Sequence, residues 1–227
     1  METLKLKSSI SLALTFSTLF LIAFAVQFFL YPEWINWGLQ PRETMGLRGI
    51  VFAPLLHASF AHFFSNIVPI FLLSFLILYH YRSYFLQILF LVWILAGFLV
   101  WLSARDSNHI GASGVVYGFA FYLITTGFLQ KDRQSLAIAL FVIFMYGSLV
   151  WGMFPNFTRL MAEKNISWES HLWGGIMGII AGFWFRPEKI KIADDDDDDE
   201  TNNQEEPYWM KIEENESKEQ IEDQSQK

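Results

Sequence analysis

A serine and a histidine in this chain lie in apolar segments, where a polar side chain is expected to have a binding partner or a function. Ser113 begins an apolar run that extends to Leu129, and His171 lies near the start of another apolar segment. An unpaired polar group is costly in hydrocarbon. A serine beside a histidine can become a nucleophile, because the imidazole accepts the hydroxyl proton. The alternative is structural, since a serine in a membrane helix often bonds to its own backbone or lets a neighbouring helix pack closely.

The composition predicts an all-α, polytopic helical membrane protein. Of 227 residues, 53% are hydrophobic and 18% are aromatic, and none is cysteine, which excludes disulfides and thiol chemistry. Apolar runs of about 20 residues are long enough to cross a bilayer as helices. We expect six such spans, at Ser9–Leu30, His62–Tyr79, Tyr84–Leu102, Ser113–Leu129, Ser135–Met153 and Trp168–Phe185.

The distribution of charge predicts the topology. An even number of spans places both termini on one side, and eight of the basic residues near the spans lie on that side against five on the other. Basic residues favour the cytoplasm, so we expect both termini of this multi-pass protein there. The membrane we expect is a bacterial inner membrane. Residues 1–192 form the predicted membrane domain.

The remaining segment, 193–227, is predicted to be a disordered acidic tail. Fifteen acidic residues and three lysines lie from Asp194 onward, including six consecutive aspartates, although the whole chain carries a net charge of only −7. Such a segment cannot bury enough apolar surface to fold. Neither the tail nor the basic residues beside the spans indicate nucleic-acid binding.

The topology predicts that four polar residues meet. The second, fourth and sixth spans run in the same direction, and at ~1.5 Å per residue their polar residues lie ~20–26 Å from the cytoplasmic ends. Small residues at helical spacing accompany two of them, with Gly174, Gly178 and Gly182 beside His171, and Gly114 and Gly118 beside Ser113. Such stripes let helix backbones approach closely. We therefore expect the imidazole of His171 to reach the Ser113 hydroxyl, with Tyr117, one turn further along, supporting the ring.

A serine nucleophile also needs donors for the oxyanion that forms on its substrate. His62 offers a ring N–H, Asn66 offers an amide, and the backbone of Ser113 offers an N–H at a helix start. No carboxylate is placed to orient the histidine: Glu169 faces elsewhere on its helix, and Asp106 lies in a loop. The expected machinery is a Ser–His dyad.

These residues resemble the motifs of the rhomboid family of intramembrane serine proteases. The family's Gly-x-Ser-Gly motif appears as residues 111–114, with Gly111 and Ser113, and its tyrosine four residues after the serine appears as Tyr117. The other motifs appear as His57, His62 and Asn66, and as His171, Gly174 and Gly178. The similarity covers Leu47 to Trp184. It departs from the family at Leu47-Arg48, where a Trp-Arg pair is often found.

The resemblance implies a six-span core in which Ser113 is the nucleophile, His171 is the base, and His62 and Asn66 bind the oxyanion. It also implies substrates that are membrane proteins with a single span, cleaved within the lipid bilayer or near it. No cofactor and no metal are expected. The spacing of His57 and His62 suits a metal poorly, and the spans hold no aspartate pair for an aspartyl protease. A catalytically inactive rhomboid-like binding protein and a small transporter remain the alternatives.

Overall fold

The computed structural model describes residues 2–154 and 167–187, and they fold almost entirely as helices. These ranges contain no strand, although Leu39 and His109 form an isolated antiparallel bridge between two loops. Three helical stretches of the described chain are long and apolar enough to cross a membrane, namely Glu2–Leu30, Phe60–His80 and Arg82–Ser103. The protein is therefore an all-helical integral membrane protein. The count of six spans remains a prediction, because the other apolar helices of the described residues do not combine the required length and hydropathy.

The helical elements are labelled in chain order, and η marks a 3₁₀ or π helix. They are α1 (Glu2–Ala25), η1 (Val26–Leu30), η2 (Pro32–Trp37), η3 (Thr44–Arg48), α2 (Gly49–Phe52), η4 (Ala53–Leu55), α3 (Phe60–His80), η5 (Arg82–Tyr84), α4 (Phe85–Leu89), η6 (Phe90–Leu95), α5 (Ala96–Ser103), α6 (Ser113–Gln130), α7 (Arg133–Tyr146), η7 (Gly147–Met153) and α9 (Trp168–Trp184).

Serine side chains cap two of the helices that carry the polar residues. The α3 helix begins after Ser59, whose hydroxyl accepts the N–H of His62 at 3.1 Å. The α9 helix begins after Ser167, whose hydroxyl accepts the N–H of Ser170 at 3.3 Å. These caps satisfy N–H groups that have no partner inside the helix. They therefore fix where α3 and α9 start, and with that the heights of the residues in their first turns.

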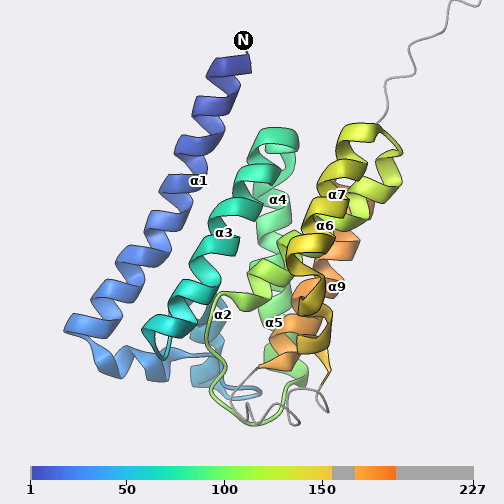
Figure 1. The fold of residues 1–227 in the computed structure, drawn as a ribbon. Helices are drawn as coiled ribbons and strands as arrows, with labels where there is room; N and C mark the ends of the chain where they lie inside the picture. The colour runs from blue at the N-terminus through green and yellow to red at the C-terminus, as the bar shows by residue number, and fades with distance from the viewer. Residues whose placement is uncertain (1, 155–166, 188–227) are drawn as a thin grey trace, which may run out of the picture. The chain divides into compact units, whose positions relative to one another are not determined.

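The α6 helix is enclosed by its neighbours, whereas α1 lies at an edge. Eleven of the 18 residues of α6 are buried, and the helix packs most extensively against α9, with α7 and α3 on its other sides. Only five of the 24 residues of α1 are buried, and its main partner is α3. Figure 1 shows α1 at one edge, with α3 between it and the remaining helices. Ser113, at the start of this enclosed helix, is itself only partly buried.

Two predicted segments differ from the structure. The fifth predicted span, Ser135–Met153, is not one α-helix, because α7 ends at Tyr146 and a 3₁₀ helix follows. Gly147 and Gly152 lower the helix propensity there and allow the tighter winding. Between the first and second predicted spans, the chain forms four short helical segments that the apolar runs did not predict. The predicted tail, 193–227, lies outside the described residues.

Candidate active site

The α6 and α9 helices bring Ser113 and His171 into direct contact. Nε2 of His171 lies 2.8 Å from Oγ of Ser113, and Nδ1 lies 2.9 Å from the carbonyl oxygen of Gly152. A carbonyl oxygen only accepts, so in the neutral imidazole Nδ1 carries the proton and Nε2 accepts the hydroxyl of Ser113. This tautomer leaves Nε2 able to take the serine proton. The geometry is that of a nucleophile and its general base.

The carbonyl group of Gly152 was not expected from the sequence. It occupies the place beside Nδ1 that a carboxylate holds in a serine triad. Every residue has a backbone carbonyl group, so residue type does not identify this acceptor. The one signal in the sequence is that residue 152 is a glycine, which has no side chain. A Cβ on Gly152 would overlap the hydroxyl of Tyr117 and lie 3.1 Å from Nδ1 of His171. Glycine therefore makes room for both rings.

Tyr117 holds the plane of the imidazole. The rings of Tyr117 and His171 stack with centroids 4.1 Å apart and an angle of 9° between their planes. Tyr117 lies one helical turn after Ser113, which places its ring against the face of the imidazole while Ser113 meets the edge. Stacking and the bond to Gly152 together fix the orientation of the ring. This is the supporting position expected from the sequence.

Close contact between two helix backbones brings the serine and the histidine together. Two glycines of α9 face two glycines of α6, with Gly174 against Gly114 and Gly178 against Gly118. A Cβ on either α9 glycine would overlap the carbonyl oxygen opposite it. The hydrogens in those positions therefore point at the two oxygens, as in the weak Cα–H···O contacts of closely packed helices. The predicted small-residue stripes thus meet, and any larger residue would separate the helices.

The loop before Ser113 is held in a conformation that requires glycine. Gly111 has φ of +104°, and a Cβ there would lie 2.6 Å from Nε2 of His62. The N–H of Gly111 donates to the carbonyl oxygen of Ala53 at 2.9 Å, and the N–H of Ala112 donates to Nε2 of His57 at 3.4 Å. Burial, reinforced by the neighbouring His62, lowers the pKa of His57 to about 3. The ring is therefore neutral and able to accept this bond.

The expected oxyanion donors lie on the α3 turn beside this loop. The ring of His62 packs against Gly111, and Nδ2 of Asn66 donates to the carbonyl oxygen of His62 at 2.7 Å. An amide nitrogen carries two hydrogens, so this bond leaves one for a ligand. Ser113 is the first residue of α6, where N–H groups lack helical partners. The side chain of His62 therefore lies beside the loop that leads to Ser113, and Asn66 follows one turn along α3.

Arg48 lies in η3, within the segment between η1 and α3, which we call the first loop. Its guanidinium carbon lies 5.3 Å from the ring centre of Trp37, and one of its nitrogens donates to the carbonyl oxygen of Asn36 at 3.3 Å. A cation over an indole ring is a stabilising contact. Arg48 thus joins η3 to η2 within the loop.

Two histidine rings lie against each other beside the loop. The rings of His57 and His62 meet edge to face with centroids 5.0 Å apart, and Nε2 of His57 accepts the Ala112 N–H. Among the described residues, no three His, Cys, Asp or Glu side chains are grouped so that they could hold a metal ion.

Comparison with known proteins places this chain in a family. A family model for the rhomboid domain matches residues 45–188. Two uncharacterised proteins, one of Mycobacterium tuberculosis and one of Mycobacterium leprae, are each 34% identical to this chain, over 152 and 154 residues respectively. These alignments cover 64% and 65% of this chain, but only 62% and 60% of the relatives. The chain belongs to the rhomboid family.

Proposed function

We propose that this protein is an intramembrane serine protease in which Ser113 is the nucleophile and His171 is its general base. The observation that carries the proposal is the 2.8 Å contact between Oγ and Nε2, made by an imidazole whose other nitrogen is bound to a carbonyl group. Membership of the rhomboid family supports the same reaction class. The resemblance of residues 111–114 to the family's serine motif supports the assignment of the nucleophile.

The reaction follows from this geometry. Oγ of Ser113 attacks the carbonyl carbon of the peptide bond while Nε2 of His171 takes its proton. The oxyanion accepts bonds from the Ser113 N–H and from the side chains of His62 and Asn66. His171 then gives its proton to the departing amine, which leaves an acyl group on Ser113. A water molecule, deprotonated by His171, attacks this ester, releases the new carboxyl terminus and restores the serine.

The substrates and the membrane arrangement are part of the proposal. We infer substrates with a single membrane span, cleaved in the span or near it. The catalytic domain comprises residues 1–192, crosses the membrane six times and keeps both termini in the cytoplasm, in a bacterial inner membrane. The basic residues near the spans support this arrangement, because more of them lie on the side that holds the termini than on the other side.

Covalent labelling tests the proposed nucleophile. A fluorophosphonate should modify Ser113 in the intact, detergent-solubilised protein, and peptide mapping should locate the adduct there. Ser113→Ala should abolish both labelling and cleavage of a single-span reporter substrate. His171→Ala should reduce both by several orders of magnitude, because no other base contacts the hydroxyl in the described part of the chain.

Ser74 provides a control, because it is a buried serine of α3 whose hydroxyl bonds within its own helix. Its Oγ donates to the carbonyl oxygen of Phe71 at 3.1 Å. Ser74→Ala should retain labelling at residue 113. Labelling that persists at full strength in Ser113→Ala would refute the proposed nucleophile.

A further inference from the structure

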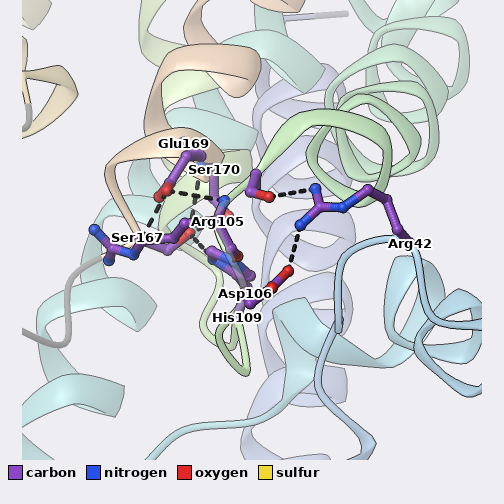
Figure 2. Close-up of polar contacts among 8 residues, drawn as sticks. Arg42, Arg105, Asp106, His109, Ser167, Glu169 and Ser170 are labelled. Carbon is purple, nitrogen blue, oxygen red and sulfur yellow. Dashed lines mark hydrogen bonds and ion pairs between the residues drawn. The ribbon is translucent and has the colours of Figure 1, made fainter.

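A second polar cluster lies beside the dyad and takes no part in the chemistry proposed above. It joins the loop before α6 to the first turn of α9, and we call it the loop–helix latch. Its members are Arg105, His109, Ser167, Glu169 and Ser170 (Figure 2). The loop side of the latch runs on to the candidate nucleophile, and the helix side runs on to the candidate base.

One half of the latch is a chain of hydrogen bonds through His109. Its Nε2 donates to the carbonyl oxygen of Arg105 at 3.0 Å, so its Nδ1 accepts from the hydroxyl of Ser167 at 2.6 Å. The hydroxyl of Ser167 in turn accepts from the hydroxyl of Ser170 at 2.6 Å. Burial lowers the pKa of His109, which keeps the imidazole neutral as this pattern requires. Every polar atom of this half is thereby matched.

The other half of the latch is the carboxylate of Glu169. Its Oε1 accepts the backbone N–H of Arg105 at 3.4 Å and lies 3.5 Å from Nε of the same residue. The carboxylate is buried, with a side-chain exposure of 5%. Its second oxygen, Oε2, has no hydrogen-bond partner in the described part of the chain. A buried charge costs stability compared with an apolar side chain of similar size. A gain in the stability of the fold therefore does not explain why a glutamate occupies position 169.

The position of the latch relates it to the dyad. Glu169 and Ser170 immediately precede His171, while His109 lies four residues before Ser113. The contact of the two helices begins at this level, because a Cβ on Gly114 would lie 3.1 Å from the carbonyl oxygen of Ser170. A shift of the loop against the first turn of α9 would change the approach of Nε2 to Oγ. Displacements of about 1 Å at a reacting centre can cost about a hundredfold in rate.

We propose that Glu169, His109 and Ser167 are positioning residues, which set the separation of Ser113 and His171 by fastening the loop to α9. The inference rests on the proposed function, because it assigns these residues a part in the same reaction. None of them contacts the reacting atoms. They act through the two chain segments that they connect.

The same loop carries a control. Asp106 forms an ion pair with Arg42, and Figure 2 shows this pair extending away from α9 toward the first loop. The Asp106 side chain is 88% exposed, in contrast to that of Glu169. Asp106→Asn therefore removes the charge that pairs with Arg42 and leaves the hydrogen bonds of the latch in place. An exposed pair of this kind contributes little to stability.

The test compares four variants in the full-length protein, namely Glu169→Ala, Glu169→Gln, Ser167→Ala and Asp106→Asn. Four quantities are measured for each: the rate constant for labelling of Ser113 by a fluorophosphonate, kcat and KM for a single-span reporter substrate, and the melting temperature. Labelling is normalised to the folded fraction. Glu169→Ala and Ser167→Ala should lower the labelling rate constant and kcat together, by about tenfold to a hundredfold. KM should stay within about twofold of wild type.

Two comparisons separate positioning from a structural role. Glu169→Gln, which keeps an acceptor oxygen for Arg105, should recover part of the loss, and Asp106→Asn should behave as wild type. Folded Glu169→Ala and Ser167→Ala proteins that label at the wild-type rate would overturn the inference. An equal loss in Asp106→Asn would also overturn it.

Two further outcomes are decisive. If Glu169→Ala fails to fold, the pair Ser167→Ala and Ser167→Thr decides, because threonine keeps the hydroxyl and should restore the labelling rate. Failure of that restoration contradicts the inference. If the wild-type protein itself shows no labelling that depends on Ser113, the proposed function is refuted. If the wild-type protein is labelled and the latch variants are labelled equally well, only the latch inference is refuted. The two failures are therefore distinguishable.

Discussion

The imidazole of His171 is held by neighbours of three different kinds: a hydroxyl group, a backbone carbonyl group and an aromatic ring. Rotation of the ring about its bond to the helix would break the bonds to Ser113 and Gly152 and disturb the stacking on Tyr117. The tautomer and the orientation are therefore set without a carboxylate. In this respect a backbone group does what an aspartate does in a triad.

The first prediction concerns the space around Gly152. Gly152→Ala should lower the labelling rate of Ser113 by at least about tenfold, because a new Cβ would overlap the hydroxyl of Tyr117. Tyr117→Phe removes that hydroxyl and keeps the stacked ring. The double variant should therefore be more active than Gly152→Ala alone, as measured by the rate of phosphonate labelling.

Gly147→Ala is the control for this experiment. It lies in the same 3₁₀ helix, and among the described residues its Cβ would meet only Cγ2 of Ile143, at 3.7 Å. It should leave labelling near the wild-type rate. A double variant no faster than Gly152→Ala would mean that the hydroxyl of Tyr117 is not the obstacle.

The second prediction separates oxyanion donors from structural polar residues. His62→Ala and Asn66→Ala should lower kcat, by up to about 10²–10³ for loss of a single donor, with little change in KM. Steady-state kinetics on a reporter substrate measure this. If Asn66 instead acts through its bond to the carbonyl oxygen of His62, Asn66→Ala should lower the melting temperature and leave kcat unchanged.

Residue type and spacing predicted the pair of Ser113 and His171, because glycines at helical intervals mark the faces along which two helices approach. The same reasoning could not find Gly152 or the latch. Gly152 acts through its carbonyl group, which every residue possesses. His109 and Arg105 lie in a loop, where no helical period relates their positions to those of Ser167 and Glu169. Sequence reasoning assigned Glu169 correctly to a face other than that of His171, and the structure adds what that face contacts.

At the scale of the elements, the third prediction concerns the contact of α6 with α9. Gly178→Ala should destabilise the protein, by about 1–3 kcal/mol if it behaves like overpacking of a core, and should slow labelling of Ser113. The cause is overlap of the new Cβ with the backbone of Gly118, which cannot move without separating the helices. The melting temperature and the labelling rate are the two measurements.

Gly175→Ala is the matched control on the same helix. Its Cβ would lie 2.7 Å from Cε of Met153, the flexible end of a side chain that can turn away. Both substitutions raise helix propensity equally, so a difference between them reports the helix contact alone. Equal behaviour of the two variants would show that the face bearing Gly178 does not govern the packing of α9.

The apolar runs predicted the helices themselves well, and their interruptions less well. The predicted second and fourth spans agree with α3 and α6 to within a few residues. The end of α7 at Tyr146 and the 3₁₀ helix after it were missed, because an apolar run continues through both. Hydrophobicity indicates where the chain can lie in a membrane, but the winding of the helix depends on local packing and on glycine.

At the scale of the whole molecule, the fourth prediction concerns stability against pH. The native protein holds His57 neutral, with a pKa of about 3, whereas the unfolded chain titrates near the ordinary value of 6.5. Below pH 6.5 the unfolded state binds a proton that the native state does not, so stability should fall as the pH drops from 6.5 toward 3. His109, whose pKa is also lowered by burial, acts in the same direction. Well above the ordinary histidine pKa, neither residue should contribute a pH dependence.

Melting temperatures between about pH 8 and about pH 4 measure this effect in detergent. His57→Gln keeps a side-chain acceptor near the Ala112 N–H and removes the titrating group, so its profile should be flatter than that of wild type. A profile for His57→Gln as steep as that of wild type would assign the acid sensitivity to other groups.

The fifth prediction concerns orientation in the membrane. The six proposed spans and the distribution of basic residues predict that both termini lie in the cytoplasm. A reporter that is active only in the cytoplasm should therefore be active when fused after Lys227. Activity of a periplasmic reporter at that position would invert the topology. The start of α6 would then open toward the cytoplasm.

The backbone contact of α6 and α9 has a mechanical consequence. Helices separated by long side chains can slide over one another as the side chains repack, but two backbones that touch at glycine can part only by opening a gap that no atom fills. We therefore expect the two helices to resist separation along these glycines, while the latch holds the loop at the end of that contact. In the proposed protease, we expect the displacement that admits a polypeptide to Ser113 to come from the other elements.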